Sequence, residues 1–298
     1  MLEKHSAPCQ DFEVTPDLFE SFMPKHFSNK GVSILIRLRS LSLVTFFAYA
    51  SVQARPSTQE SFMPDNDLWM DDSIEAVSNI SEAQFNKIID VAVKSYEPIA
   101  YANREHLTIQ RMWNDSTVNA TMRRDKNSMN IYIHLFGGLA RRPEVTIEGF
   151  ALVLCHEFGH AYGGQPFIDP NLEIAAEGIA DYYGASTCFN NILDAIPSSI
   201  IDVNNEAGYI AERCRNLYAS DGNRYNHCVR GLNAGISLGR LLSSSNKEKE
   251  PNYQTPDKSV VKTTEISYPK TIQCRVDTYH NALLGLIKPA CWFSPVPN

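Results

Sequence analysis

The sequence lacks the excess of positive charge that is typical of nucleic-acid-binding proteins. Its 298 residues include 27 Lys and Arg against 34 Asp and Glu, which gives a net charge of −7. It has no Cys-x-x-Cys pair, which argues against a cysteine-based metal site. An apolar run at 41–50 is too short for a comfortable membrane span. We therefore expect neither a nucleic-acid partner nor a stable membrane span, although an uncleaved signal anchor stays open.

The N-terminal region has the pattern of a secretory signal peptide. Four basic residues between positions 25 and 39 precede the apolar run, and the small-residue sequence Ser-Val-Gln-Ala follows at 51–54. We expect residues 1–54 to be removed on export, with Met23 as an alternative start of translation. Residues 55–80 are polar and are predicted to form a flexible lead-in. The mature chain is expected to be secreted or periplasmic.

Export leaves an even number of cysteines. Of the seven in the sequence, Cys9 lies in the predicted signal peptide, and an even number in an exported chain favours disulfides. Two local pairs, Cys214 with Cys228 and Cys274 with Cys291, each close a loop across predicted turns. Cys155 and Cys188 are then left to each other, or Cys155 is a buried free thiol.

The segment 155–160, Cys-His-Glu-Phe-Gly-His, lies within an apolar stretch that is predicted to be a buried helix. Thr146 is its candidate N-cap, and two glycines after Tyr162 end it. The four-residue spacing brings His156 and His160 onto one helix face, where both imidazoles can reach a single metal ion. Glu157 lies one step round the helix, where it can accept a proton from water. The alternative is that the motif arose by chance and the histidines are hydrogen-bonded core residues.

A second acidic motif follows at 173–184, which we predict to be another helix, capped by Asp169 or Asn171. Catalytic zinc sites commonly have three protein ligands and one open position. Glu177 and Asp181 are four residues apart and share a helix face. Glu173 shares the same face and is a rival third ligand. If Glu173 bound the metal, Glu177 would take the orienting role.

The two motifs, H-E-x-x-H and E-x-x-A-D-x-x-G, together resemble the gluzincin metallopeptidases, the group of thermolysin, and some uncharacterised exported bacterial proteins. The resemblance covers residues 129–190. It implies that Zn²⁺ is held by His156, His160 and Glu177, that Asp181 orients His156, and that Glu157 is the catalytic base. One departure is the short connection of sixteen residues between His160 and Glu177.

The remaining periodicities predict an α+β fold in a single domain over 81–298, and the resemblance implies that this fold is zincin-like. A capping box at Ser81 and Gln84 starts a helix that we expect to end before Pro98. Alternating residues then predict a small, mostly antiparallel sheet packed on the H-E-x-x-H helix, followed by a helical C-terminal half. The resemblance further implies that the strand at 129–136 presents its edge to an extended substrate.

We therefore expect an exported zinc metallopeptidase, most simply an endopeptidase, with a peptide or protein substrate. Two alternatives remain, a hydrolase of cell-wall peptide and a non-catalytic binding module stabilised by zinc. Related enzymes add a Tyr or His that stabilises the oxyanion. The sequence offers five candidates for this role: Tyr225, His227, Tyr268, Tyr279 and His280.

Overall fold

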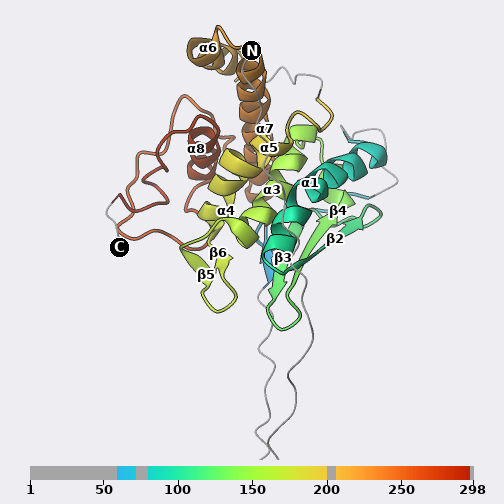
Figure 1. Ribbon diagram of the computed structural model, residues 1–298. Helices are drawn as coiled ribbons and strands as arrows, with labels where there is room; N and C mark the ends of the chain where they lie inside the picture. Colours follow the sequence, from blue (N-terminus) through green and yellow to red (C-terminus); the bar gives the residue numbers. More distant parts are fainter. Residues whose placement is uncertain (1–58, 72–79, 200–205, 296–298) are drawn as a thin grey trace, which may run out of the picture. The chain divides into compact units, whose positions relative to one another are not determined.

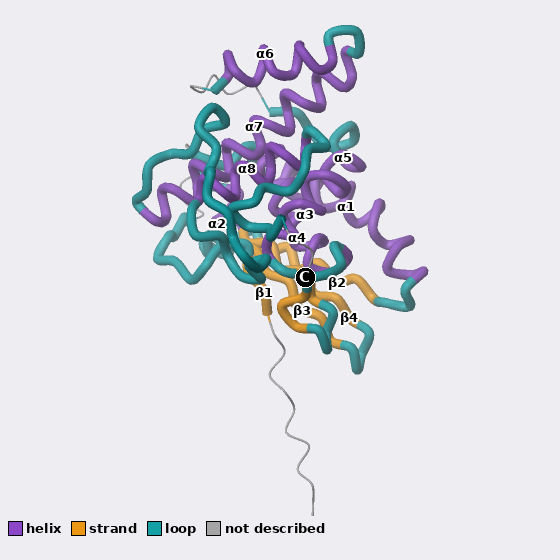
Figure 2. The backbone as a smooth tube through the Cα atoms, turned by 90° about the vertical axis from the view of Figure 1, so that its left-hand side faces the viewer, coloured by secondary structure: helices purple, strands orange, loops and turns teal. Residues whose placement is uncertain are grey.

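The computed structural model describes residues 59–71, 80–199 and 206–295. These residues belong to one compact unit, residues 54–298, and the predicted signal peptide lies outside the described residues. The unit combines helices with a small mixed sheet, which is compatible with the α+β class (Figure 1). Helices lie on one side of the strands (Figure 2). In chain order the elements are β1 (Gln59–Ser61), α1 (Glu82–Ala102), β2 (His106–Met112), β3 (Ala120–Asp125), β4 (Asn130–Phe136), α2 (Gly137–Ala140), α3 (Ile147–Tyr162), β5 (Phe167–Asp169), β6 (Ile174–Ala175), α4 (Glu177–Tyr183), η1 (Gly184–Cys188), α5 (Phe189–Ile192), α6 (Ala207–Tyr218), α7 (Gly222–Asn246) and α8 (Ile272–Leu283).

The larger sheet has the strand order β1-β3-β4-β2. Strand β3 pairs antiparallel with both β1 and β4, whereas β2 pairs parallel with β4. Over almost its whole length β4 has a partner on each side, so its backbone is already hydrogen-bonded. The expectation that residues 129–136 present a free edge to substrate is therefore wrong. Within the described residues, β1 and β2 form the edges of this sheet.

Strand β1 makes part of the predicted lead-in integral to the domain. The Phe62 amide donates to the carbonyl of Ala120 at 3.0 Å, which extends the pairing of β1 with β3. The Asn119 side chain accepts from the amide of Met63 and donates to its carbonyl, both at 3.0 Å. Phe62 and Met63 are buried in the main hydrophobic core. Over its described residues, the segment 59–71 is thus not a lead-in separate from the domain.

Helix α3, which carries the H-E-x-x-H motif, runs through the core. Every residue from Ile147 to Ala161 is buried, as expected for a helix that is apolar on almost every side. Thr146 caps it by accepting a hydrogen bond from the Gly149 amide at 3.0 Å. The helix contacts α4, η1, α7, α1 and β3 (Figure 1). The motif therefore sits where several elements converge.

Two predicted helix boundaries are wrong. Helix α1 has the predicted capping box but continues past Pro98 to Ala102, on a stretch where residues 97–99 are exposed. Pro98 has no backbone N–H, so the carbonyl four residues earlier in the helix loses its partner, and water can bind that carbonyl on this exposed stretch. The second helix begins at Glu177 and not near residue 173. Strands β5 and β6 fill the preceding segment, where Glu173 adopts a left-handed φ of 54°.

Three disulfides fasten the helices in the described part of the chain. Two of them join the local pairs that the sequence favoured, and the third settles the open alternative for Cys155 in favour of a bond to Cys188. Cys155 is bonded to Cys188, which ties α3 to η1, and Cys214 is bonded to Cys228, which ties α6 to α7. Cys274 on α8 is bonded to Cys291. Their Cα separations of 5.4, 5.7 and 6.0 Å are ordinary for disulfides. Within the described residues, no helix combines the length and apolar character needed to cross a bilayer.

Candidate metal centre

Helices α3 and α4 bring His156, His160 and Glu177 together, and these three residues form a group that could hold a metal ion. The Nε2 atoms of His156 and His160 lie 3.5 and 3.6 Å from the Glu177 carboxylate oxygens. The two helices approach closely because Gly159 has no side chain. A Cβ on Gly159 would overlap the backbone of Ala180. The close approach of the helices therefore depends on this glycine.

The hydrogen bonds of the two histidines leave both Nε2 atoms free to bind a metal. His160 Nδ1 lies 2.8 Å from the carbonyl oxygen of Ala175, which can only accept, so Nδ1 must carry the proton. His156 Nδ1 likewise donates to Asp181 at 2.7 Å. Burial lowers the pKa of both histidines, which favours the neutral imidazoles. Neutral imidazoles with bare Nε2 atoms can bind a metal ion and do not form an ion pair with Glu177.

The unsatisfied atoms of the centre are those that a metal ion would bind. The Nε2 atoms of His156 and His160 and both carboxylate oxygens of Glu177 are buried and have no hydrogen-bond partner. Unpaired buried groups of this kind are costly, and a divalent cation removes the cost. Zinc bonds of about 2.0–2.1 Å in a tetrahedron place ligand atoms about 3.3 Å apart. The observed separations of 3.5 and 3.6 Å are close to this value, so the residues fit such an ion.

Glu157 is the remaining polar residue of the motif, and both of its carboxylate oxygens are also buried without a partner. Burial raises the pKa of Glu157 well above its usual value, Arg275 opposes this shift, and Glu60 and Asp181 add to it. Its carboxylate is therefore one that readily takes up a proton. This is the property required of a general base beside a water molecule.

Asp181, which orients His156, is itself held by a buried arginine. Its carboxylate accepts from Arg275 Nε at 2.8 Å and Nη2 at 3.2 Å, and from the Tyr279 hydroxyl at 2.8 Å. Burial alone would raise the pKa of Asp181, but Arg275 and His156 outweigh it and lower the pKa to about 2. Asp181 is thus ionised and fixed, which holds the imidazole of His156 in place.

The N-terminal strand and the C-terminal region also border the centre. The ring of Phe62 packs edge-on against His156, with 5.4 Å between the ring centroids. Arg275 Nη1 donates to the carbonyl of Phe62 at 2.7 Å, and the Tyr268 hydroxyl donates to the carbonyl of Ser61 at 2.6 Å. The sequence did not predict the roles of Phe62 and Arg275. No local motif marks either residue, because their partners in the centre are far away in the sequence. Arg275, for example, is 94 residues from Asp181.

The structure separates the remaining sequence candidates. Glu173 is exposed and forms an ion pair with Lys126 at 3.2 Å, so it is not the third ligand. Of the five oxyanion candidates, Tyr279 donates to Asp181 and Tyr268 donates to the carbonyl of Ser61, and only Tyr268 has a pKa that Glu177 and Glu157 both raise. The other three lie among other partners. Tyr225 packs against the cluster around the disulfide of α6 and α7, His227 bonds Asp194, and His280 lies 3.4 Å from Tyr209.

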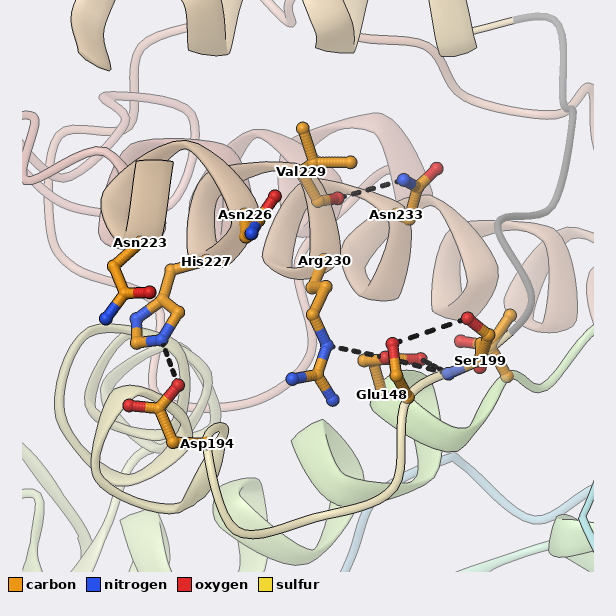
Figure 3. A pocket seen from close by; sticks show the side chains of 11 residues that line it. Glu148, Asp194, Ser199, Asn223, Asn226, His227, Val229, Arg230 and Asn233 are labelled. Atoms are coloured by element: carbon orange, nitrogen blue, oxygen red, sulfur yellow. Dashed lines mark hydrogen bonds and ion pairs between the residues drawn. The ribbon is translucent and has the colours of Figure 1, made fainter. Parts of the chain in front are cut away.

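A separate cavity of about 360 Å³ lies between α7 and residues 194–199 (Figure 3). Glu148 reaches it from the first turn of α3, two helical turns and about 12 Å from His156. Its charged groups pair with each other, Arg230 with Glu148 at 2.8 Å and His227 with Asp194 at 2.6 Å (Figure 3). No comparable set of unsatisfied atoms points into it among the described residues. We therefore take the metal group as the functional site.

Comparison with known proteins found no matching family model, no matching curated protein and no matching solved structure.

Proposed function

We propose that the protein is an exported zinc metallopeptidase that hydrolyses peptide bonds, with His156, His160 and Glu177 as the metal ligands. One observation carries the proposal. A fully buried Glu157, with both oxygens unpartnered, lies beside a three-residue metal group whose ligand atoms are equally unpartnered. A purely structural metal site needs the ligands but has no use for this neighbouring carboxylate. The three disulfides fit an oxidising, extracellular compartment.

When bound, the zinc ion supplies Lewis acidity, which polarises a carbonyl group and increases the acidity of water. The chain supplies the rest. Glu157 accepts a proton from the attacking water and returns it to the leaving amine. Asp181 keeps His156 in the tautomer that binds metal, and Arg275 keeps Asp181 ionised. Tyr268 is the candidate donor to the negative charge that develops on the substrate carbonyl, once its hydroxyl turns away from the carbonyl of Ser61.

An extended substrate would add to the outer edge of β1, where it would take the place of the Tyr268 hydroxyl on the carbonyl of Ser61. Because the Phe62 amide bonds Ala120 on β3, the strand alternation turns the backbone groups of Ser61 and Gln59 away from β3. These groups lie next to the metal group, since Phe62 contacts His156. Strand addition recognises any peptide backbone, which suits an endopeptidase.

The test is the variant Glu157→Gln, which removes the base but keeps its shape. We expect zinc content and folding to be unchanged and hydrolysis of a peptide library to fall by at least a hundredfold. The matched control is Glu97→Gln, since Glu97 is an exposed glutamate on α1. The unaltered protein should lose activity with a chelator and recover it with zinc.

Two results would contradict the peptidase assignment. If the zinc-loaded protein hydrolyses neither protein nor cell-wall peptides, the metal group belongs to a binding module. If Glu157→Gln and the unaltered protein have equal activity, the hydrolysis has another origin. Comparing casein-type substrates with purified cell-wall peptide identifies which amide substrate is preferred.

A further inference from the structure

Glu60 is a charged residue that the proposed chemistry leaves unused, although it faces the metal group. On β1 it lies opposite Met122 of β3, and its side chain emerges on the same sheet face as that of Phe62, two residues along. Phe62 contacts His156 on that face. Glu60 is also near enough to Glu157 and Glu177 to raise the pKa of each carboxyl group. Its carboxylate therefore lies on the face of β1 that carries Phe62 and within electrostatic range of both Glu157 and Glu177.

Glu60 has no counter-ion of its own. It is half-buried, and among the described residues it forms no side-chain hydrogen bond or ion pair. Burial, with a contribution from Asp169, raises its pKa, as expected for a carboxylate without a cation nearby. Arg275 is the cation that lies closest to the centre, and it is already held by Asp181, Tyr279 and the carbonyl of Phe62.

The charges of the centre leave a negative excess. With Glu60, Glu157, Glu177 and Asp181 ionised, four negative charges face one guanidinium and one divalent ion. One negative charge remains. Arg275 pairs with Asp181 and Glu177 and lowers the pKa of Glu157, whereas it has no such effect on the pKa of Glu60. A partly buried carboxylate in this position attracts a cation and repels an anion.

We propose that Glu60 is a specificity-determining residue, which selects peptides that carry a positively charged group beside the scissile bond. This inference rests on the proposed peptidase function. The bound group is a cation that donates hydrogen bonds, either the side chain of Lys or Arg or the free amino group at a peptide N-terminus. Substrate bound along the edge of β1 passes the backbone of Gln59 and Ser61, which flank Glu60 in the chain. Its side chains or its terminus can therefore reach the carboxylate.

The selectivity test uses matched fluorogenic peptides that differ at one position, with Lys, norleucine or Glu in turn. For the zinc-loaded full chain, we expect kcat/KM to be at least about tenfold higher with Lys than with norleucine, and lowest with Glu. In Glu60→Gln the ratio of Lys to norleucine should fall to about one, and in Glu60→Lys the Glu peptide should become preferred. The control variant Glu97→Gln should keep the original ratio. An unchanged ratio in Glu60→Gln overturns the proposal.

The two sources of the cation are separated by acetylating the peptide N-terminus. If a free terminus is the bound group, acetylation removes the preference and the internal Lys is irrelevant. If a side chain is bound, acetylation has no effect and the Lys position decides. Selectivity that depends on neither group contradicts the inference.

A binding measurement separates this inference from the function on which it rests. In the Glu157→Gln background, fluorescence anisotropy should show that the Lys peptide binds about tenfold more tightly than the norleucine peptide, and that adding Glu60→Gln abolishes the difference. If this holds while the unaltered protein hydrolyses nothing, the peptidase function fails and the cation site stands. If hydrolysis occurs but Glu60→Gln alters neither binding nor selectivity, only the role of Glu60 fails.

Discussion

At the scale of single residues, the orientation of His156 depends on one carboxylate. Asp181 accepts the Nδ1 proton of His156 and is fixed by Arg275 and Tyr279. We expect Asp181→Asn to weaken zinc affinity by about 10- to 100-fold, because an amide can present its NH₂ group to the imidazole and permit the wrong tautomer. Competition with a chromophoric chelator measures the affinity.

The chain offers a matched control in a second Asp–His pair. Asp194 accepts from His227 at 2.6 Å at the separate cavity, where the aspartate is exposed. Asp194→Asn should leave zinc affinity unchanged. Equal affinities in Asp181→Asn and the unaltered protein would show that Asp181 does not orient the ligand.

Tyr268 provides a second prediction at this scale. Its ring lies near Arg275, with 5.7 Å between the guanidinium carbon and the ring centroid, and burial together with Glu177 raises its hydroxyl pKa, so it remains a protonated donor. We expect Tyr268→Phe to lower kcat by about 10- to 100-fold with little change in zinc content. Tyr225→Phe is the control. If KM rises while kcat is kept, Tyr268 only anchors Ser61.

At the scale of elements, the contact between α3 and α4 is set by glycine. A methyl group on Gly159 would collide with the backbone of Ala180, which is not free to move as a side chain is. We expect Gly159→Ala to destabilise the fold by about 1–3 kcal/mol and to weaken zinc binding. Gly208→Ala on α6, where a new Cβ meets nothing within 4 Å, should be neutral or stabilise by up to about 1 kcal/mol. Denaturant unfolding of the metal-free variants tests both, and similar values for the two would contradict the packing argument.

Elements with strong local signals were predictable from the sequence, and elements defined by distant partners were not. Helix α3 has a cap, an apolar surface and a glycine stop, and all three are visible in the chain. Strand β1 has three residues and gains its stability from pairing with β3. It is too short for an alternation of apolar and polar residues to be recognised in the sequence. The turn around Glu173 interrupts what resembled one helical stretch, because β5 and β6 pair across it.

The same distinction applies to the candidate site. The four-residue spacing of His156 and His160 predicted that they share a helix face, and the resemblance to gluzincins implied that Glu177 joins them, as it does in the structure. Arg275 and Glu60 reach the centre only through the fold, from α8 and β1. A motif therefore predicts the ligands, and tertiary structure supplies the charges that surround them.

At the scale of the whole molecule, the metal group joins segments from both ends of the described chain. Phe62, which directly follows β1, packs on His156, and Arg275 from α8 binds both Asp181 and the carbonyl of Phe62. The Cys274–Cys291 disulfide holds α8 to the C-terminal segment next to this arginine. Metal binding should consequently stabilise the entire unit, and not only α3 and α4.

Removal of the metal tests this coupling. Without the ion, several buried polar atoms of the centre have no partner, and a ligand present at about 1,000 times its dissociation constant stabilises the fold by about 4 kcal/mol. We expect a chelator to lower the unfolding temperature by several degrees and zinc to restore it, with Glu157→Gln responding fully and His160→Ala not at all. Calorimetry should show one transition that moves as a whole. A separate low-temperature transition that alone depends on zinc would mean that the centre unfolds independently of the strands and helices around it.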